Sequence, residues 1–135
     1  MSNANIIFPK GDRASSDYFT GVVWVKNLVI GDDVLNTVIG NVVFESGARN
    51  NWHRHGGGQI LIATEGLGYY QEKGKPARLL QPGDVVQIPP GLVHWHGAGP
   101  DKPFTHIAIN PNINKGVVEW LEPVTDKEYK EAIGS

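Results

Sequence analysis

Near the middle of the chain stands the run Gly47-Ala48-Arg49-Asn50-Asn51-Trp52-His53-Arg54-His55-Gly56-Gly57-Gly58-Gln59, which holds two histidines one residue apart and then an amide side chain. Successive side chains of a β-strand point to opposite faces, so His53 and His55 are expected to share one face. Trp52 and Arg54 are expected to point the other way. Two imidazoles on one face of a sheet can bind a divalent metal ion, and the run therefore predicts half of a metal site.

A second histidine pair repeats this spacing. All five histidines lie between residues 53 and 106, and they are His53, His55, His94, His96 and His106. A lone histidine is usually held by hydrogen bonds in a core or on a surface. Two His-x-His pairs in one small β domain instead favour a metal site that is built from two neighbouring strands.

The rest of the chain has the pattern of many short strands. Its 135 residues fit one domain, and 17 glycines and 9 prolines supply turn signals about every ten residues. Strands are expected at residues 21–30, 37–44, 52–55, 59–64, 68–72, 85–88, 93–96 and 104–109, and residues 78–80 lead into a Pro-Gly turn at residues 81–84. The Gly56-Gly57-Gly58 run lets the backbone turn or bulge before the fourth of these. This pattern predicts an all-β sandwich or barrel.

The two ends of the chain have their own signatures. Residues 1–20 are expected to form an N-terminal arm, and residues 21–135 the β domain. Thr125 and Glu128 have the spacing of a capping box, which predicts a short C-terminal helix from about 125 to 133. Trp52 and Trp95 are expected to point outward next to their histidines and could mark a subunit interface, so we expect a homodimer or homotetramer.

Composition excludes several classes of function. The net charge of −2, with no basic run, gives no reason to expect nucleic-acid or membrane-surface binding. The absence of cysteine excludes disulfides, thiolate ligands and a cysteine nucleophile. Residues 1–10 lack the pattern of a secretory signal, and no apolar stretch approaches the roughly 20 residues of a membrane span. A cytoplasmic protein is expected.

Two spaced motifs in this chain resemble those of the cupins. Residues 47–66 read G-x5-H-x-H-x3-Q-x6-G, and residues 83–94 read G-x5-P-x-G-x2-H. The resemblance implies a small single-domain β-barrel of the jelly-roll type with a metal inside, held by His53, His55 and His94. Two positions depart from the usual pattern, because Gln59 stands where many cupins have Glu and Ala98 stands where the second motif usually ends in Asn.

Gln59 changes the electrostatics of the expected site. Three neutral imidazoles and a neutral amide leave the full charge of a divalent ion uncancelled, which makes the ion a stronger Lewis acid. Such a ligand set accepts Mn²⁺, Fe²⁺, Co²⁺ or Ni²⁺ with open positions, or Zn²⁺ with fewer ligands. Alternatively, Gln59 is a structural amide that caps the glycine turn.

The similarity extends from about residue 15 to residue 133 and points to a narrower group. The chain resembles small bacterial manganese cupins, which include cupin-type hydroxynitrile lyases. This resemblance implies Mn²⁺ as the metal, Gln59 as a fourth ligand, His106 as an acid/base beside it and His96 in the pocket. Gly40, Val42 and Asn110 are expected to line the substrate pocket. Alternatively, His96 and His106 only orient other groups.

These residues leave several functions open. The sharpest expectation is a metal-dependent enzyme that cleaves or forms cyanohydrins, with the metal as Lewis acid and His106 moving the proton. A dioxygenase, a decarboxylase or isomerase of small acids, and a non-catalytic small-molecule-binding cupin are alternatives, because one fold hosts many reactions.

Overall fold

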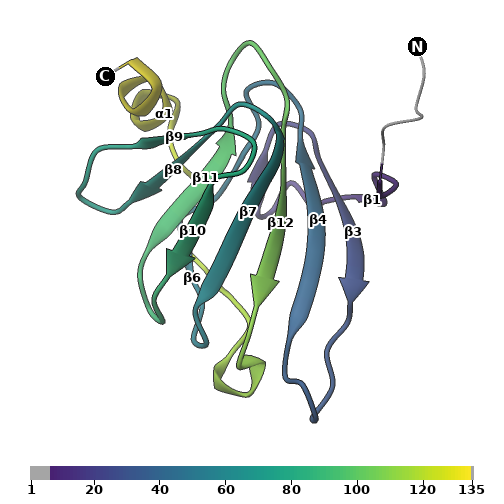
Figure 1. Cartoon of the computed structure of the whole chain (residues 1–135). Coiled ribbons are helices and arrows are strands. Elements are labelled where there is room, and N and C mark those ends of the chain that lie inside the picture. Colours follow the sequence, from purple (N-terminus) through teal and green to yellow (C-terminus); the bar gives the residue numbers. More distant parts are fainter. Residues whose placement is uncertain (1–6, 135) are drawn as a thin grey trace.

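Two β-sheets face each other and enclose the interior of the molecule (Figure 1). A computed structural model of the chain describes residues 7–134. The first sheet has six strands in the order β1 (Asp12–Arg13), β3 (Val23–Val29), β4 (Val38–Phe44), β12 (Phe104–Asn110), β7 (Gln59–Gly66) and β10 (Val85–Ile88). All of its neighbouring strands are antiparallel. The all-β barrel with one short helix is confirmed.

The second sheet has seven strands, and its centre carries the second histidine pair. Its strands are β2 (Phe19–Thr20), β5 (Arg49–Asn50), β6 (His53–Arg54), β8 (Gly68–Glu72), β9 (Arg78–Leu80), β11 (His94–Ala98) and β13 (Glu119–Trp120). Strand β11 pairs with β8 along one edge and with β5 and β6 along the other. A 3₁₀ turn, η1 (Ile113–Lys115), and the helix α1 (Asp126–Gly134) complete the fold.

The first histidine strand is shorter than the sequence predicts. The expected strand over residues 52–55 is reduced to His53–Arg54. The backbone of Trp52 pairs instead with Glu122 and Leu121, and the carbonyl of His55 accepts hydrogen bonds from Gly58 and Gly91. The alternation of faces still holds, since His53 and His55 are buried and Arg54 is exposed.

Much of the expected N-terminal arm belongs to the two sheets. Residues 1–6 of that arm lie outside the described residues. Asp12–Arg13 pairs with β3 in the first sheet, and Phe19–Thr20 pairs with β5 in the second. The side chain of Phe19 also packs against the core between the sheets.

Helix α1 covers the outer face of the second sheet. Its expected capping box is confirmed by two hydrogen bonds, from the Glu128 amide to Thr125 Oγ1 and from the Thr125 amide to Glu128 Oε1. Trp52 and Trp95 are buried beneath this helix together with Tyr129. The expectation that these tryptophans mark a subunit interface is therefore wrong, because the chain covers them itself.

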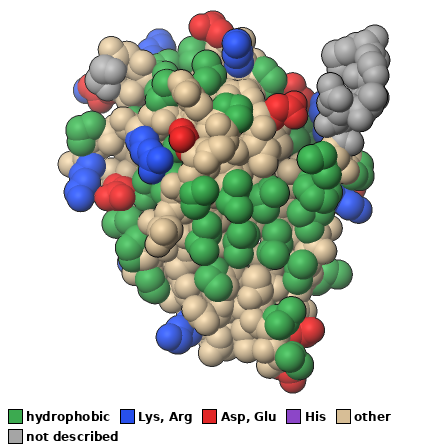
Figure 2. Space-filling model, in the orientation of Figure 1, with side chains coloured by type: hydrophobic (Ala, Val, Ile, Leu, Met, Phe, Trp, Pro, Cys, Tyr) green, Lys and Arg blue, Asp and Glu red, His purple; other side chains and the backbone are tan. Residues whose placement is uncertain are grey.

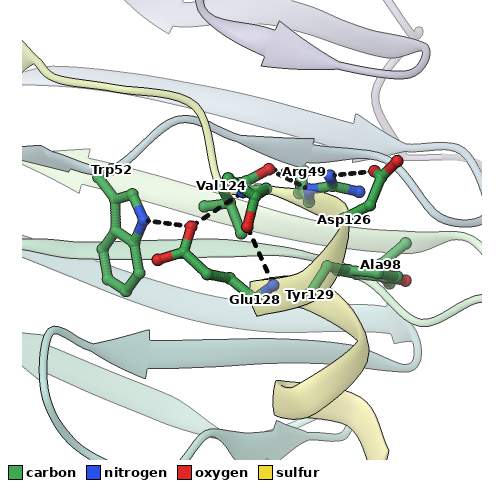
Figure 3. A network of polar contacts seen from close by, with 8 residues as sticks. Arg49, Trp52, Ala98, Val124, Asp126, Glu128 and Tyr129 are labelled. Carbon is green, nitrogen blue, oxygen red and sulfur yellow. Dashed lines mark hydrogen bonds and ion pairs between the residues drawn. The ribbon is translucent and has the colours of Figure 1, made fainter.

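A buried arginine ties the helix to the sheet (Figure 3). Arg49 on β5 donates two hydrogen bonds to the carbonyl of Val124 and one to Asp126, and its guanidinium lies 4.6 Å from the centroid of the Tyr129 ring. Trp52 Nε1 donates to Glu128 Oε1. Asn50, the next residue, faces the interior and lines the cavity. The contacts of Arg49 therefore also hold the strand that supplies Asn50.

Removing the hydroxyl of Tyr129, which also joins α1 to the second sheet, is expected to lower the stability of the protein. Tyr129 Oη donates to the carbonyl of Ala98 over 2.7 Å in a buried position. Tyr129→Phe leaves that carbonyl unpaired, so we expect the free energy of unfolding to fall by about 1–2 kcal/mol in urea denaturation. Tyr18→Phe is the matched control, because Tyr18 is exposed and its ring contact with Trp120 is kept. Equal effects of the two changes would contradict the expectation.

Candidate metal centre and cavity

Histidines from the two sequence motifs face each other across a strand pair. His53 on β6 lies directly opposite His94 on β11, and their ring centroids are 4.3 Å apart. His96 follows two residues later on β11. Ligand atoms of these three buried imidazoles all lie within 4.8 Å of one another. They form a group of three histidines that could hold a metal ion.

His55 lies beside this group without belonging to it. Its ring centroid is 5.0 Å from that of His53 and 5.6 Å from that of His94. The corresponding distances for His96 are 5.3 Å and 5.6 Å. Ring distances therefore do not distinguish His55 from His96 as the third imidazole of a metal site. The hydrogen bonds of the two side chains do distinguish them.

Backbone carbonyls orient three of the imidazoles. Nδ1 of His53, His55 and His94 each meets a carbonyl oxygen, namely those of Asn51, Val117 and Leu92 respectively. A carbonyl only accepts hydrogen bonds, so each Nδ1 carries the proton and each Nε2 keeps its lone pair. Metal-binding histidines are typically held in this way.

The glycine run lets a distant segment supply one of these carbonyls. A Cβ on Gly56 would collide with the carbonyl of Lys115, and one on Gly57 would collide with that of Pro111. Only glycine allows residues 111–117 to approach this closely, and Val117 then reaches His55. The glycine run before Gln59 thus allows the segment that orients His55 to reach the site.

Gln59 points an oxygen at the same place. Its Nε2 donates to Asn110 Oδ1 over 3.0 Å, and its Oε1 lies 3.2 Å from His94 Nε2. With the proton of His94 on Nδ1, both of these atoms present lone pairs to each other. The buried Nε2 of His55 has no hydrogen-bond partner among residues 7–134. These uncompensated acceptors fit a divalent cation held by His53, His55, Gln59 and His94.

Burial keeps the imidazoles in the form that a metal requires. It lowers the pKa of His53 well below the usual value, and the neighbouring His94 and His55 lower it further. Burial likewise lowers the pKa of His55, and it lowers that of His94 to about 4. At neutral pH these side chains are therefore neutral and free to act as ligands.

The metal-free protein is expected to lose stability as the pH falls from about 6.5 to about 4. The pKa of His94 is about 4 in the folded chain against an ordinary value of 6.5. Within that window the unfolded chain binds a proton that the folded chain does not, so acidification lowers the free energy of unfolding, by at most about 1.4 kcal/mol per pH unit for this imidazole. Urea denaturation of EDTA-treated protein at neutral pH and at about pH 5 measures the change. Equal or greater stability at the lower pH would contradict the expectation.

The other two histidines form a hydrogen-bonded pair. His106 Nε2 lies 3.0 Å from His96 Nδ1, and both side chains are buried. Asn50 holds His96 in place, since its Oδ1 accepts the backbone N–H of His96 and its Nδ2 lies 3.2 Å from the ring nitrogen Nδ1. Burial lowers the pKa of His96 well below its usual value and that of His106 to about 3. The pair is therefore neutral at pH 7.

A cavity of about 340 Å³ lies between the sheets and joins these groups. Its lining includes every position that the sequence proposes for the site except His94, that is Gly40, Val42, His53, His55, Gln59, His96, His106 and Asn110. Gly40 lies opposite Ala108, and Val42 lies opposite His106, so β4 and β12 present these side chains together. A groove of about 380 Å³ beside α1 is slightly larger but contains no histidine.

Sequence reasoning missed one wall of this cavity. The segment after β12 contributes Val117, Val118 and Trp120, and the Trp120 ring lies 4.9 Å from that of His53. Asn50 was also missed as a cavity residue, although it lies in the first motif. No periodicity or motif marks residues 111–120, so only the fold brings them to the site.

A sequence profile described as "Cupin domain" matches residues 40–110. The chain belongs to the cupin family. This cupin is 42% identical over 118 residues to an (R)-mandelonitrile lyase of Granulicella tundricola. The aligned region covers 87% of this chain and 90% of the relative. It is thus a homologue of a lyase.

Solved structures agree with this assignment. A cupin-like protein of Thermotoga maritima superposes with a TM-score of 0.91 at 57% identity, over 93% of this cupin and 96% of that chain. A DMSP lyase of Ruegeria pomeroyi superposes with a TM-score of 0.65 at 22% identity, over 86% of this cupin and 59% of that chain. The second likeness concerns the fold alone. Within residues 7–134, no helix has the length and apolarity that a membrane span needs.

Proposed function

We propose that this cupin is a metal-dependent lyase that cleaves cyanohydrins to an aldehyde and hydrogen cyanide, and that forms them in reverse. One observation carries the proposal. The imidazoles of His53 and His55, the amide of Gln59 and the hydrogen-bonded pair of His96 and His106 all line the same small cavity. The homology to an (R)-mandelonitrile lyase over most of both chains supports the same activity.

The ligands of the proposed site are His53, His55, Gln59 and His94, and the proposed ion is Mn²⁺. All four side chains are uncharged at neutral pH, so they leave the charge of a divalent ion uncancelled. A bound ion would supply Lewis acidity and favour negative charge on a substrate oxygen. Nitrogen and amide-oxygen ligands suit Mn²⁺, while Fe²⁺, Co²⁺, Ni²⁺ and Zn²⁺ are the alternatives that metal analysis must test.

The His106–His96 pair handles the proton. The hydroxyl of a cyanohydrin in the cavity gives its proton to His106, which is neutral because it is buried. The oxygen lone pair then forms the carbonyl as the bond to the nitrile carbon breaks, and the departing cyanide takes up the proton as HCN. His96 and Asn50 hold His106 in position through the 3.0 Å ring contact and the hydrogen bonds of Asn50. In synthesis the same steps run backwards.

The walls of the cavity suit a small apolar side group on the substrate. Much of the lining is aliphatic or aromatic, with Val25, Val38, Val42, Phe44, Val117, Val118 and Trp120. The volume of about 340 Å³ is near the lower end for small-molecule pockets. We assign Gly40, Val42 and Asn110 to the substrate pocket, where Asn110 also fixes Gln59.

Mandelonitrile cleavage tests this function. Protein loaded with Mn²⁺ is expected to release benzaldehyde from mandelonitrile without consuming oxygen, and EDTA-treated protein is expected to be inactive until metal is restored. Elemental analysis of protein purified without added metal identifies the ion. Absence of benzaldehyde release above the background of heat-denatured protein would reject the lyase proposal. Oxygen uptake during turnover would favour an oxygenase instead.

A further inference from the structure

Two groups of three histidines overlap in the metal centre, and both contain His53 and His94. The proposed ligand set completes this pair with His55. The ligand atoms of His53, His94 and His96, however, also lie within 4.8 Å of one another. Two ligand atoms that each bind one ion at about 2.1 Å are at most about 4.2 Å apart, so the second group would need to close by only about half an ångström. Distance alone therefore allows two metal sites.

The side-chain amide of Asn50 treats the two groups differently. Its Oδ1 accepts the backbone N–H of His96 over 2.9 Å, which fixes the orientation of the amide and turns Nδ2 toward the His96 ring. Nδ2 lies 3.2 Å from Nδ1 and 3.3 Å from Nε2 of that ring. An amide nitrogen only donates hydrogen bonds, so the ring nitrogen that pairs with it carries a lone pair and no proton.

The contact with His106 decides which nitrogen of His96 this is. His106 Nε2 lies 3.0 Å from His96 Nδ1, whereas the only hydrogen-bonding neighbour of His96 Nε2 within residues 7–134 is the Asn50 amide. With its proton on Nδ1, His96 donates to His106 and accepts from Asn50, so both of its nitrogens are satisfied. With the proton on Nε2, a buried N–H would face a donor. The first arrangement is therefore favoured, and it leaves His106 Nε2 unprotonated, as the proposed base requires.

His55 differs from His96 in the state of one atom. Nδ1 of His55 donates to the carbonyl of Val117, and its buried Nε2 has no partner among the described residues. Nδ1 of His96 likewise donates, to His106, but its Nε2 already accepts a hydrogen bond from Asn50. A metal ion needs an unprotonated nitrogen with a free lone pair. Asn50 thus leaves His55 available as a ligand and withholds His96.

The fold holds Asn50 close to β11. Gly97 on β11 lies opposite Arg49, and a Cβ on Gly97 would lie 2.7 Å from the Cα of Arg49. Only glycine allows β5 to approach this closely. Arg49 is in turn tied to Val124 and Asp126 beside the start of α1 (Figure 3). The backbone next to Asn50 is therefore held on both sides, which keeps the amide beside its histidine.

We propose that Asn50 selects the metal ligands. Its amide occupies the Nε2 lone pair of His96 and so prevents a second metal site that His96 would form with His53 and His94. This inference rests on the metal site of the proposed function. Its consequence is that His96 does not take a position that the substrate oxygen needs. Without the amide, His96 would have the same arrangement as His55, with the Nδ1 proton engaged and the Nε2 lone pair free.

Restored metal binding in a variant that lacks His55 tests the selection. The affinity of EDTA-treated protein for Zn²⁺, an ion that imidazoles bind well, is measured by competition with a chromophoric chelator. His55→Ala is expected to bind roughly 100-fold more weakly than the wild type. Addition of Asn50→Ala is expected to restore at least about 10-fold, because His96 becomes the third imidazole. Addition of His96→Ala to this double variant is expected to remove the gain.

Asn51→Ala in the background of His55→Ala is the matched control. Asn51 is also a buried asparagine, but its Nδ2 donates to two backbone carbonyls outside the metal centre. No gain from Asn50→Ala in a folded variant, an equal gain from Asn51→Ala, or a gain that survives His96→Ala would overturn the proposal. A wild type that binds no Zn²⁺ would instead reject the proposed metal site, and the selection with it. Metal binding is the readout, so failure of the lyase activity alone leaves the result interpretable.

A measurement on the wild-type chain covers the case in which Asn50→Ala does not fold. Nitrogen-15 NMR of the metal-free protein distinguishes a ring nitrogen that carries a proton from one that carries a lone pair. We expect the proton of His96 on Nδ1 and the lone pair on Nε2. A proton on Nε2 would show that Asn50 does not hold this lone pair, and would overturn the proposal without any variant.

Discussion

The change His55→Ala is expected to empty the metal site, whereas His96→Ala is expected to leave it filled. The two imidazoles have almost the same ring distances to His53 and His94, so the comparison is well matched. Only His55 combines a proton on Nδ1 held by a carbonyl with a buried Nε2 that has no partner among the described residues. Both ring nitrogens of His96 lie beside Asn50.

Elemental analysis and metal titration measure this difference. For His55→Ala we expect a metal affinity lower by at least about 100-fold, since loss of a ligand costs more than the 10–100-fold loss of a group that only orients one. For His96→Ala we expect close to one equivalent of metal per chain. Metal loss in His96→Ala together with full occupancy in His55→Ala would show that the ion is held by the group of His53, His94 and His96. Circular dichroism of both variants verifies that the fold is kept.

The change His106→Ala is expected to abolish most cyanohydrin cleavage while the metal stays bound. His106 lines the cavity and is not among the proposed ligands, and its position opposite Val42 on the inner side of the first sheet is independent of the histidine motifs. Removing a general acid/base typically costs about 10²–10⁴-fold in rate, so we expect a loss of this size in kcat/KM for mandelonitrile.

A double variant shows whether His96 and His106 act as one unit. Because a hydrogen bond of 3.0 Å joins them, His96→Ala is expected to slow the reaction alone but to add little in the background of His106→Ala. The matched control is Thr105→Ala, on the outward face of the same strand. Full activity of His106→Ala with bound metal would remove this residue from the mechanism and assign it a purely structural role.

Much of the site could be predicted because its signals are local. The His-x-His spacing places His53 and His55 on the inner side with Arg54 outside, as strand alternation requires. The capping box of Thr125 and Glu128 is likewise a property of four consecutive residues. Prediction was less accurate where a local rule competed with long-range pairing. The strand expected over residues 52–55 is shorter in the structure, because Trp52 pairs with Glu122 and Gly56 follows at the other end.

Sequence alone could not show what covers each surface. Trp52 and Trp95 point away from the metal site as expected, but α1 folds back over them, so they are core residues. The isoleucines on the outer side of β4, β7 and β12 look like ordinary strand residues in the sequence. They form one apolar surface only when the six strands lie side by side (Figure 2).

The chain by itself determined the family, the all-β barrel, the histidine pairs and Gln59, because the spacing of two short motifs and the period of strands encode them. Tertiary structure alone decided which imidazoles can act as ligands. The carbonyl that orients His55 comes from Val117, and the amide that orients Gln59 comes from Asn110, each more than fifty residues away along the chain. Such contacts depend on the pairing of distant strands and on a close approach that glycine permits, and no local pattern encodes either of them.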